Sequence, residues 1–317
     1  MSVHLSRREL LASTGLACGA ALAGHLPEAA AQPARANEKL FRYSLNTSTI
    51  REQKLGIVRE VEVASQAGYD AIEPWMGTLD EYVKGGGSLK DLRKRIADSG
   101  LTVESAIGFA QWIVNDDEAR KNGLEQARRD MDTLAQIGGK RIAAPPVGAH
   151  DKPGPDLPTA AARYRTLLEL GNQMGIIPQA EVWGFSKTLS RLAETVYVAV
   201  ASGHPQACVL PDVYHLHKGD SGFQSLKLLS GVAVQVFHLN DYPADPPRET
   251  INDSHRVYPG DGVAPLVPML RDLRLAGFRG VLSLELFNRD YWKQDPLVVA
   301  KTGLEKMRTV VAKSLEA

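Results

Sequence analysis

Short apolar runs alternate with longer amphipathic stretches from residue 41 to the end of the chain. Short apolar runs bounded by turn residues are typical of buried strands, and an apolar spacing of about 3.6 residues is typical of helices packed on a core. We therefore expect strands at residues 41–46, 71–75, 102–107, 141–145, 177–182, 207–212, 232–239 and 281–286. Helices are expected at residues 55–66, 89–98, 118–136, 159–173, 190–202, 222–229, 265–276 and 296–315.

This regular alternation predicts a parallel sheet, and eight strands are the number that closes into a (β/α)8 TIM barrel with a packed interior. A doubly wound open sheet is the alternative. Such a sheet normally has a glycine-rich phosphate-binding turn after an early strand. The triplet Gly85-Gly86-Gly87 stands in a predicted loop without that context. We predict one α/β barrel domain over residues 41–317.

The N-terminal residues predict an export signal that precedes the barrel. Arg7 and Arg8 come before a charge-free stretch from Leu10 to Pro27, and small residues at 29–31 offer a cleavage site. This order is typical of secretory signals, and the arginine pair resembles a twin-arginine signal. A membrane anchor is disfavoured because the apolar run is shorter than the roughly 20 residues that a spanning helix needs. We predict a twin-arginine-type signal peptide at 1–31, a linker at 32–40, and a periplasmic or secreted mature protein.

Composition narrows the expected partners. Lys plus Arg and Asp plus Glu both number 37, so the formal net charge is zero. Nucleic-acid binding depends on clustered Lys and Arg, so a nucleic acid is not an expected partner. Cleavage after Ala31 would leave Cys208 as the only cysteine, which excludes an internal disulfide in the mature chain.

Polar residues end the last four predicted strands, each after an apolar run. They are Glu181, Asp212, His238 and Glu285. In a closed barrel these positions converge at the C-terminal mouth, where active sites of this fold lie. One such residue alone is equally well a solvated strand end, but three converging carboxylates repel one another unless a cation or protons neutralise them. Three carboxylates with one imidazole suit Mn²⁺, Mg²⁺, Co²⁺ or Zn²⁺, and we predict one divalent metal here.

Further polar and aromatic residues are predicted at the same mouth. Glu73 ends the second strand, Trp183 and His215 follow Glu181 and Asp212 closely, and Arg256 opens a turn-rich loop after the seventh strand. A tryptophan here fits either stacking on a sugar ring or ordinary packing between helix and strand. We predict that Glu73, Trp183, His215 and Arg256 bind the substrate.

The order Glu, Asp-x-x-His, His-x-x-Asp and Glu on the last four strands, with Pro-Gly-Asp-Gly at 259–262, resembles the xylose-isomerase-like TIM barrels. The resemblance covers roughly residues 41–315 of a superfamily that includes ketose 3-epimerases, hydroxypyruvate isomerase, inosose dehydratase and metal-dependent apurinic endonucleases. It implies that Glu181, Asp212, His238 and Glu285 are metal ligands, that Glu181 and Glu285 exchange the substrate proton, and that His215 binds substrate. The chain departs from the epimerases at Lys187, where they have a second glutamate, and at Ala244, where they have an arginine.

These residue types fit proton transfer next to a carbonyl, since a metal can polarise the carbonyl while two carboxylates take and return the proton. We expect a metal-dependent isomerase or epimerase of a sugar or keto-sugar acting through an enediolate. Export favours a non-phosphorylated substrate. A lyase or dehydratase acting on a keto-sugar or 3-keto-glycoside is the alternative, and a non-catalytic periplasmic sugar-binding barrel is the alternative of another class. No membrane contact is expected after signal cleavage, and the sequence leaves a homo-oligomer open.

Overall fold

The structure is a computed structural model that describes residues 40–316. The predicted signal peptide and the linker up to residue 39 lie outside the described residues. The strands are β1 Arg42–Asn46, β2 Ala71–Glu73, β3 Thr102–Val103, β4 Arg141–Ala144, β5 Ile177–Glu181, β6 Val209–Leu210, β7 Val236–Leu239 and β8 Val281–Leu284. The α-helices are α1 Ile57–Ala67, α2 Met76–Lys84, α3 Leu89–Asp98, α4 Asp117–Gln136, α5 Leu157–Met174, α6 Leu192–Ala201, α7 Val213–Lys218, α8 Leu266–Leu275 and α9 Pro296–Glu316. Short 3-10 helices are η1 Thr47–Gln53, η2 Gln224–Leu228, η3 Asp253–His255 and η4 Tyr291–Lys293.

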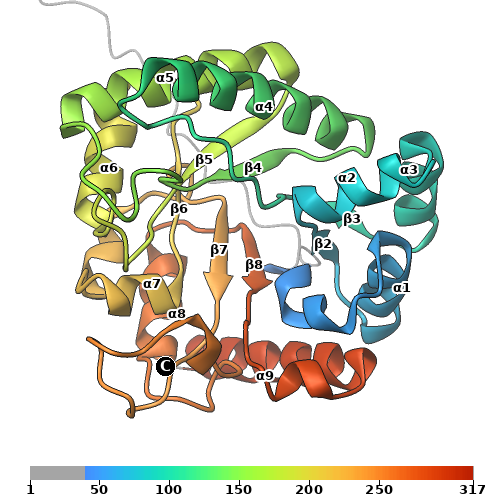
Figure 1. Cartoon of the computed structure of the whole chain (residues 1–317). Helices are drawn as coiled ribbons and strands as arrows, with labels where there is room; N and C mark the ends of the chain where they lie inside the picture. Colours follow the sequence, from blue (N-terminus) through green and yellow to red (C-terminus); the bar gives the residue numbers. More distant parts are fainter. Residues whose placement is uncertain (1–39, 317) are drawn as a thin grey trace, which may run out of the picture. The chain divides into compact units, whose positions relative to one another are not determined.

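All paired strands are parallel, and together they close into a barrel. The hydrogen-bonded orders are β3-β2-β1-β8-β7 and β4-β5-β6. Single parallel bridges join the two sets, from Ile107 to Ala143 on one side and from Asp212 to His238 on the other. In Figure 1 the helices form a ring around these strands, with α4 and α5 above them and α9 below. The predicted single-domain (β/α)8 barrel is confirmed, and the open-sheet alternative is excluded.

Capping residues account for where several outer helices begin and end. Asp116 accepts a hydrogen bond from Ala119 N at 2.7 Å at the start of α4, and Asp156 accepts one from Thr159 N at 2.8 Å at the start of α5. These side chains satisfy backbone N–H groups that have no partner inside the helix. Helix α1 ends at Gly68, whose φ of 92° is a left-handed conformation that suits glycine. Such ends let each helix turn back into the next strand.

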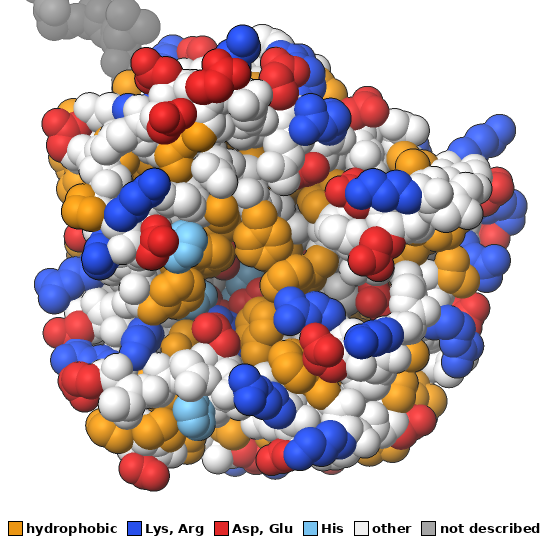
Figure 2. Space-filling view, in the orientation of Figure 1, with side chains coloured by type: hydrophobic (Ala, Val, Ile, Leu, Met, Phe, Trp, Pro, Cys, Tyr) orange, Lys and Arg blue, Asp and Glu red, His pale blue; other side chains and the backbone are white. Residues whose placement is uncertain are grey.

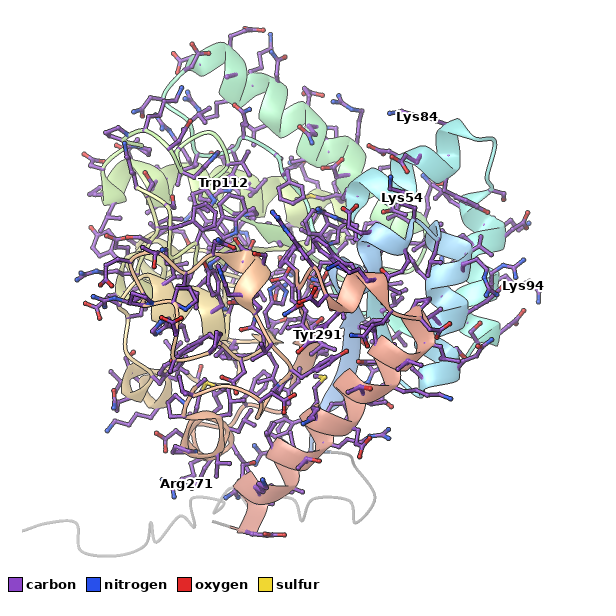
Figure 3. The ribbon with its side chains drawn as sticks, turned by 60° about the horizontal axis from the view of Figure 1, so that its bottom comes forward. Lys54, Lys84, Lys94, Trp112, Arg271 and Tyr291 are labelled. Atoms are coloured by element: carbon purple, nitrogen blue, oxygen red, sulfur yellow. The ribbon has the colours of Figure 1, made fainter. Side chains whose placement is uncertain are left out.

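Large aromatic side chains fill the space between the barrel and its helices, while charged side chains cover the outside. Trp112 is 1% exposed, and its indole N–H donates to Pro145 O at 2.9 Å. Figure 3 shows Trp112 inside the ring of helices, whereas Lys84, Lys94 and Arg271 lie at the edge. Among the described residues, no helix is long and apolar enough to cross a membrane.

An ionic network lies between the first residues of several strands. The carboxylate of Glu104 accepts hydrogen bonds from Arg42, from Thr102 Oγ1 at 2.9 Å and from Lys140 Nζ at 2.9 Å. Arg141 Nη1 lies 3.3 Å from the same carboxylate. Burial alone would raise the pKa of Glu104, but the contacts with Lys140, Thr102 and Arg42 lower it. This network ties the strand starts together at the end of the barrel opposite the mouth.

One predicted helix was wrong, and two short helices were missed. The stretch at 222–229 forms only the 3-10 helix η2, because Gly222 before it has a left-handed conformation and Leu229 after it is already extended. Helices α2 and α7 were not predicted. Helix α7 has only six residues and starts directly after β6, so it is too short to show a helical apolar period.

Candidate active site and metal centre

The four predicted ligands come from neighbouring strand ends and all are buried. Glu181 is the last residue of β5, Asp212 follows β6, His238 lies within β7, and Glu285 directly follows β8. Their exposed fractions are 3%, 0%, 0% and 4%, in that order. Because the strands are parallel, these side chains meet at one end of the barrel. Figure 2 shows this end hollowed at its centre, with acidic and histidine side chains at the bottom and hydrophobic ones at the rim.

The carboxylates gather around one nitrogen of His238. Nδ1 of His238 lies 3.2 Å from Glu285 Oε2, 3.8 Å from Glu181 Oε1 and 4.0 Å from Asp212 Oδ2. Glu181, His238 and Glu285 can each offer one ligand atom such that these atoms lie within 4.8 Å of one another. The structure therefore brings three of the predicted ligands to one point and places Asp212 next to it.

The other nitrogen of His238 faces Glu73, which lies behind the ring. Glu73 Oε2 is 3.1 Å from Nε2 of His238, although the angle in the structure is not aligned for a hydrogen bond. The same oxygen accepts hydrogen bonds from Ser283 Oγ at 2.6 Å and Asn46 Nδ2 at 3.1 Å. Burial alone would lower the pKa of His238, but Glu285 and Glu73 raise it well above the usual value. A carboxylate behind a histidine in this way favours a proton on Nε2 and points Nδ1 at the site.

Glu181 and Glu285 have opposite protonation tendencies. Burial raises the pKa of Glu181 well above its ordinary value, with the charges of Glu285 and Asp212 adding to the shift and His238 opposing it. Burial acts on Glu285 too, but His238 and Arg256 more than offset it and lower the pKa of this carboxyl. Neighbouring carboxyl groups whose environments move their pKa values apart are typical of acid–base pairs.

The residues present fit a divalent metal. The carboxylate of Glu181 accepts no hydrogen bond within residues 40–316, although Glu181 is buried, and its nearest ionic partner is His238 at 3.8 Å. Neither ring nitrogen of His238 makes an aligned hydrogen bond. A buried charge without a donor is costly, and a cation between these groups would remove the cost. Carboxylate oxygens with one imidazole are suitable donors for the divalent ions that we predicted.

Asp212 is held by protein donors on both of its oxygens. Oδ1 accepts a hydrogen bond from the backbone N–H of His215 at 2.7 Å and so caps α7. Oδ2 accepts from Asn240 Nδ2 at 2.7 Å and from Arg256 Nη1 at 2.9 Å. Its predicted role as a metal ligand stays a prediction.

A cavity of about 160 Å³ opens above these groups. The predicted substrate-binding residues Trp183, His215 and Arg256 line it together with Glu181 and Glu285. Glu73 does not line it. The volume is below the ~300 Å³ at which pockets for drug-sized ligands begin, so it suits a single ring.

Four aromatic residues that we did not predict as site residues also line the cavity: Trp75, Phe109, Phe185 and Phe287. Trp75 contacts Phe109 and Phe287 with ring centroids 5.0 and 5.9 Å apart, and Trp183 lies 5.2 Å from Phe185. The sequence does carry a signal for three wall residues, because Trp75, Trp183 and Phe287 each follow a strand-end glutamate by two positions. Residues two apart at the end of an extended strand point to the same side.

Asp241 holds the loop that carries Arg256. Its carboxylate accepts four backbone hydrogen bonds, from Tyr242, Gly260, Gly262 and Ala264, at 2.8 to 3.1 Å. An antiparallel bridge also pairs Asp241, two residues after β7, with Val257, the residue that follows Arg256. This bridge places Arg256 beside the end of β7. The aspartate of the His-x-x-Asp motif is thus an anchor for the Pro-Gly-Asp-Gly turn.

Residues 61–310 match the model of the xylose isomerase-like TIM barrel family. The chain belongs to this family. It is 27% identical over 277 residues to an inosose isomerase of Bacillus velezensis, covering 86% of this chain and 98% of the relative. A 3-dehydroshikimate dehydratase of Pseudomonas aeruginosa is 23% identical over 81% of this chain and 40% of its own length. A 3-dehydro-D-guloside 4-epimerase of Escherichia coli is 22% identical over 70% of this chain and 85% of its own length.

The fold is also similar to a crystal structure of the IOLI protein with a bound zinc atom. That comparison gives a TM-score of 0.80 at 22% identity, covering 86% of this chain and 99% of the other. These relatives include an isomerase, an epimerase and a dehydratase.

Proposed function

We propose that this protein is a divalent-metal-dependent isomerase or epimerase of a non-phosphorylated sugar or keto-sugar. One observation carries the proposal: two carboxyl groups with opposite pKa shifts, Glu181 and Glu285, lie at the base of a cavity for a single ring. Aromatic walls suit the apolar faces of a sugar ring. The isomerase and epimerase relatives support the same reaction class.

Glu181, His238 and Glu285 would hold the metal, with Asp212 as the fourth ligand predicted from the sequence. A bound divalent ion supplies a Lewis acid for the substrate carbonyl and the adjacent hydroxyl. Glu181 and Glu285 take a proton from the carbon beside the carbonyl and return it. Return to the opposite face of that carbon gives an epimer, whereas return to the neighbouring carbon gives an isomer.

The remaining groups bind and orient the ring. Burial lowers the pKa of His215, so its imidazole is neutral at neutral pH and can hydrogen-bond a hydroxyl group. Trp183 and Phe287 cover the ring and exclude water. Glu73, which was predicted to bind substrate, has in this proposal the role of orienting His238 from behind.

The first experiment follows deuterium exchange. Metal-loaded protein is incubated in D₂O with free ketoses, aldoses and 3-keto-glycosides, and the products are identified by NMR. We expect deuterium at the carbon beside the carbonyl, together with an epimer or isomer. Glu181→Gln and Glu285→Gln should each lower the rate by roughly 10²–10⁴-fold. Glu305→Gln, at an exposed position on α9, is the matched control. Binding without exchange across the panel would refute catalysis and favour a sugar-binding barrel.

A lyase is the second candidate, favoured by the relative named 3-dehydroshikimate dehydratase. The same base can remove the proton while a substituent on the next carbon leaves. The NMR experiment separates the two, since a lyase releases the substituent and forms an unsaturated keto-sugar.

Metal dependence is tested by metal content and by thermal stability. Protein purified without chelator should contain about one equivalent of divalent metal, and metal-free protein should gain thermal stability from Mn²⁺, Co²⁺ or Zn²⁺. Failure of both tests would refute metal dependence.

We also propose export by the twin-arginine route. A reporter fused to residues 1–31 should reach the periplasm, and replacing Arg7 and Arg8 together by lysine should stop it.

A further inference from the structure

Arg256 is a buried cation placed between two of the predicted metal ligands. Its side chain is 1% exposed, and Nη1 donates to Asp212 Oδ2 and to Glu285 Oε2, both at 2.9 Å. The guanidinium also lies over the ring of Phe287 at 4.9 Å from the centroid. A guanidinium stays protonated in proteins, so this charge is permanent.

The charges around Arg256 show why a permanent cation is needed there. The buried carboxylates of Glu73, Glu181, Asp212 and Glu285 face only two cationic groups among the described residues of the site, His238 and Arg256. Asn46 and Asn240 also donate hydrogen bonds to Glu285 and Asp212, but they carry no charge. Without Arg256, Asp212 and Glu285 would repel each other across the space that the guanidinium fills.

We propose that Arg256 is a built-in counter-cation that stabilises the metal-free site and thereby limits how tightly the divalent metal binds. Arg256 neutralises Asp212 and Glu285 when no metal is present. A bound metal supplies positive charge to the same carboxylates, so Arg256 stabilises the loaded state less than the empty one. By thermodynamic reciprocity, a residue that favours the empty site must weaken metal binding. Arg256 is therefore a positioning residue with an electrostatic role, in addition to its predicted contact with substrate.

The inference has two halves: Arg256 stabilises the metal-free site, and Arg256 thereby weakens metal binding. Only the second half rests on the metal site of the proposed function. Its first half is tested on metal-free protein by thermal unfolding of Arg256→Met, Glu285→Gln and the double variant. Breaking a buried ion pair should lower the Tm of Arg256→Met by roughly 5–15 °C. Adding Glu285→Gln to Arg256→Met should recover part of that loss, because it removes one of the stranded charges. Additive losses in the double variant would overturn the counter-cation role.

The second half is tested by titrating Zn²⁺ or Mn²⁺ into wild type and Arg256→Met by calorimetry, and by the Tm with and without metal. We expect Arg256→Met to bind the metal at least several-fold more tightly and to recover more Tm on metal addition than wild type. Arg256→Lys keeps the charge, so it should respond to metal like wild type. Should the methionine variant not fold, Arg256→Gln, which removes the charge and keeps a hydrogen-bond donor, replaces it. Arg51→Met is the matched control, since Arg51 stacks on Trp75 at 4.8 Å and its only carboxylate partner within residues 40–316 is Glu52.

The outcomes separate the two proposals. Weaker or unchanged metal binding by Arg256→Met, while wild type binds metal, overturns the inference and leaves the proposed function standing. Wild type that binds no metal refutes the metal-dependent function and the second half of the inference together. In that case the metal-free double variant still decides whether Arg256 is the counter-cation.

Discussion

Replacing Glu73 by glutamine tests whether the group behind His238 controls metal binding. Glu73 is 1% exposed, and one of its oxygens faces Nε2 of His238 at 3.1 Å while accepting from Ser283 and Asn46. A glutamine fits the same space, and its carbonyl can still accept from those two donors. That carbonyl would then also face Nε2 of His238, but it carries no negative charge. The preference for a proton on Nε2 would weaken, and the tautomer with its proton on Nδ1 would become more populated.

That tautomer puts a hydrogen where the metal would bind. Loss of such an orienting carboxylate typically costs 10–100-fold in metal affinity, which corresponds to about 1.4–2.8 kcal/mol. We therefore expect Glu73→Gln to raise the Kd for Zn²⁺ or Mn²⁺ by this factor in calorimetric titration at fixed pH. Ser283→Ala is the control, because it removes one hydrogen bond from Glu73 and leaves the carboxylate, and its effect should be smaller. A Kd for Glu73→Gln within twofold of wild type would refute the orienting role.

Three further changes test other parts of the structure. Burial, with the charge of Glu81 adding to it, raises the pKa of Glu60 from 4.5 to about 8. The folded state therefore keeps a proton that the unfolded chain loses, and wild type should lose stability as pH rises from about 4.5 to 8. Glu60→Gln should raise the Tm at pH 9 and leave it nearly unchanged at pH 4, and an equal change at both would contradict this. Glu104→Gln should lower the Tm by several degrees without changing metal affinity, because it leaves Arg42, Lys140 and Arg141 without their shared carboxylate. Loss of metal binding in this variant would argue against a purely structural role of Glu104. Asp241→Asn should raise the KM more than it lowers the kcat, because three backbone hydrogen bonds from the loop that carries Arg256 are weakened. An unchanged KM would refute the loop-anchoring role.

The barrel and the strand-end residues were predictable from the sequence for a geometric reason. In a parallel barrel the residue at the end of each strand points into one shared mouth, so the order along the chain is enough to group Glu181, Asp212, His238 and Glu285. The apolar runs before them are long enough to mark the strands. Strand length was less predictable, since β3 and β6 each pair over only two residues.

The contacts of Arg256 and Glu73 were not predictable, because the sequence gives the strand end but not which side of the site a side chain occupies. Arg256 reaches Asp212 and Glu285 from a loop that Asp241 helps to hold, and those partners are 44 and 29 residues away along the chain. Glu73 looked like a substrate contact from its position at the end of β2. The ring of His238 stands in front of it, which only the folded arrangement reveals.

The charged base and the aromatic wall of the cavity depend on each other. Trp75, Trp183 and Phe287 each stand two residues after a strand-end glutamate, so each of these strands supplies a ring to the cavity wall, and β5 and β8 also supply the carboxyl groups of Glu181 and Glu285 to its base. Rings at this place exclude water from the carboxylates, and a lower local dielectric strengthens each charge–charge interaction. The raised pKa of Glu181 has burial as its largest cause, and Trp183 is part of the wall that buries it. In the proposed function the wall would therefore do more than hold a sugar ring, because it also raises the proton affinity of Glu181.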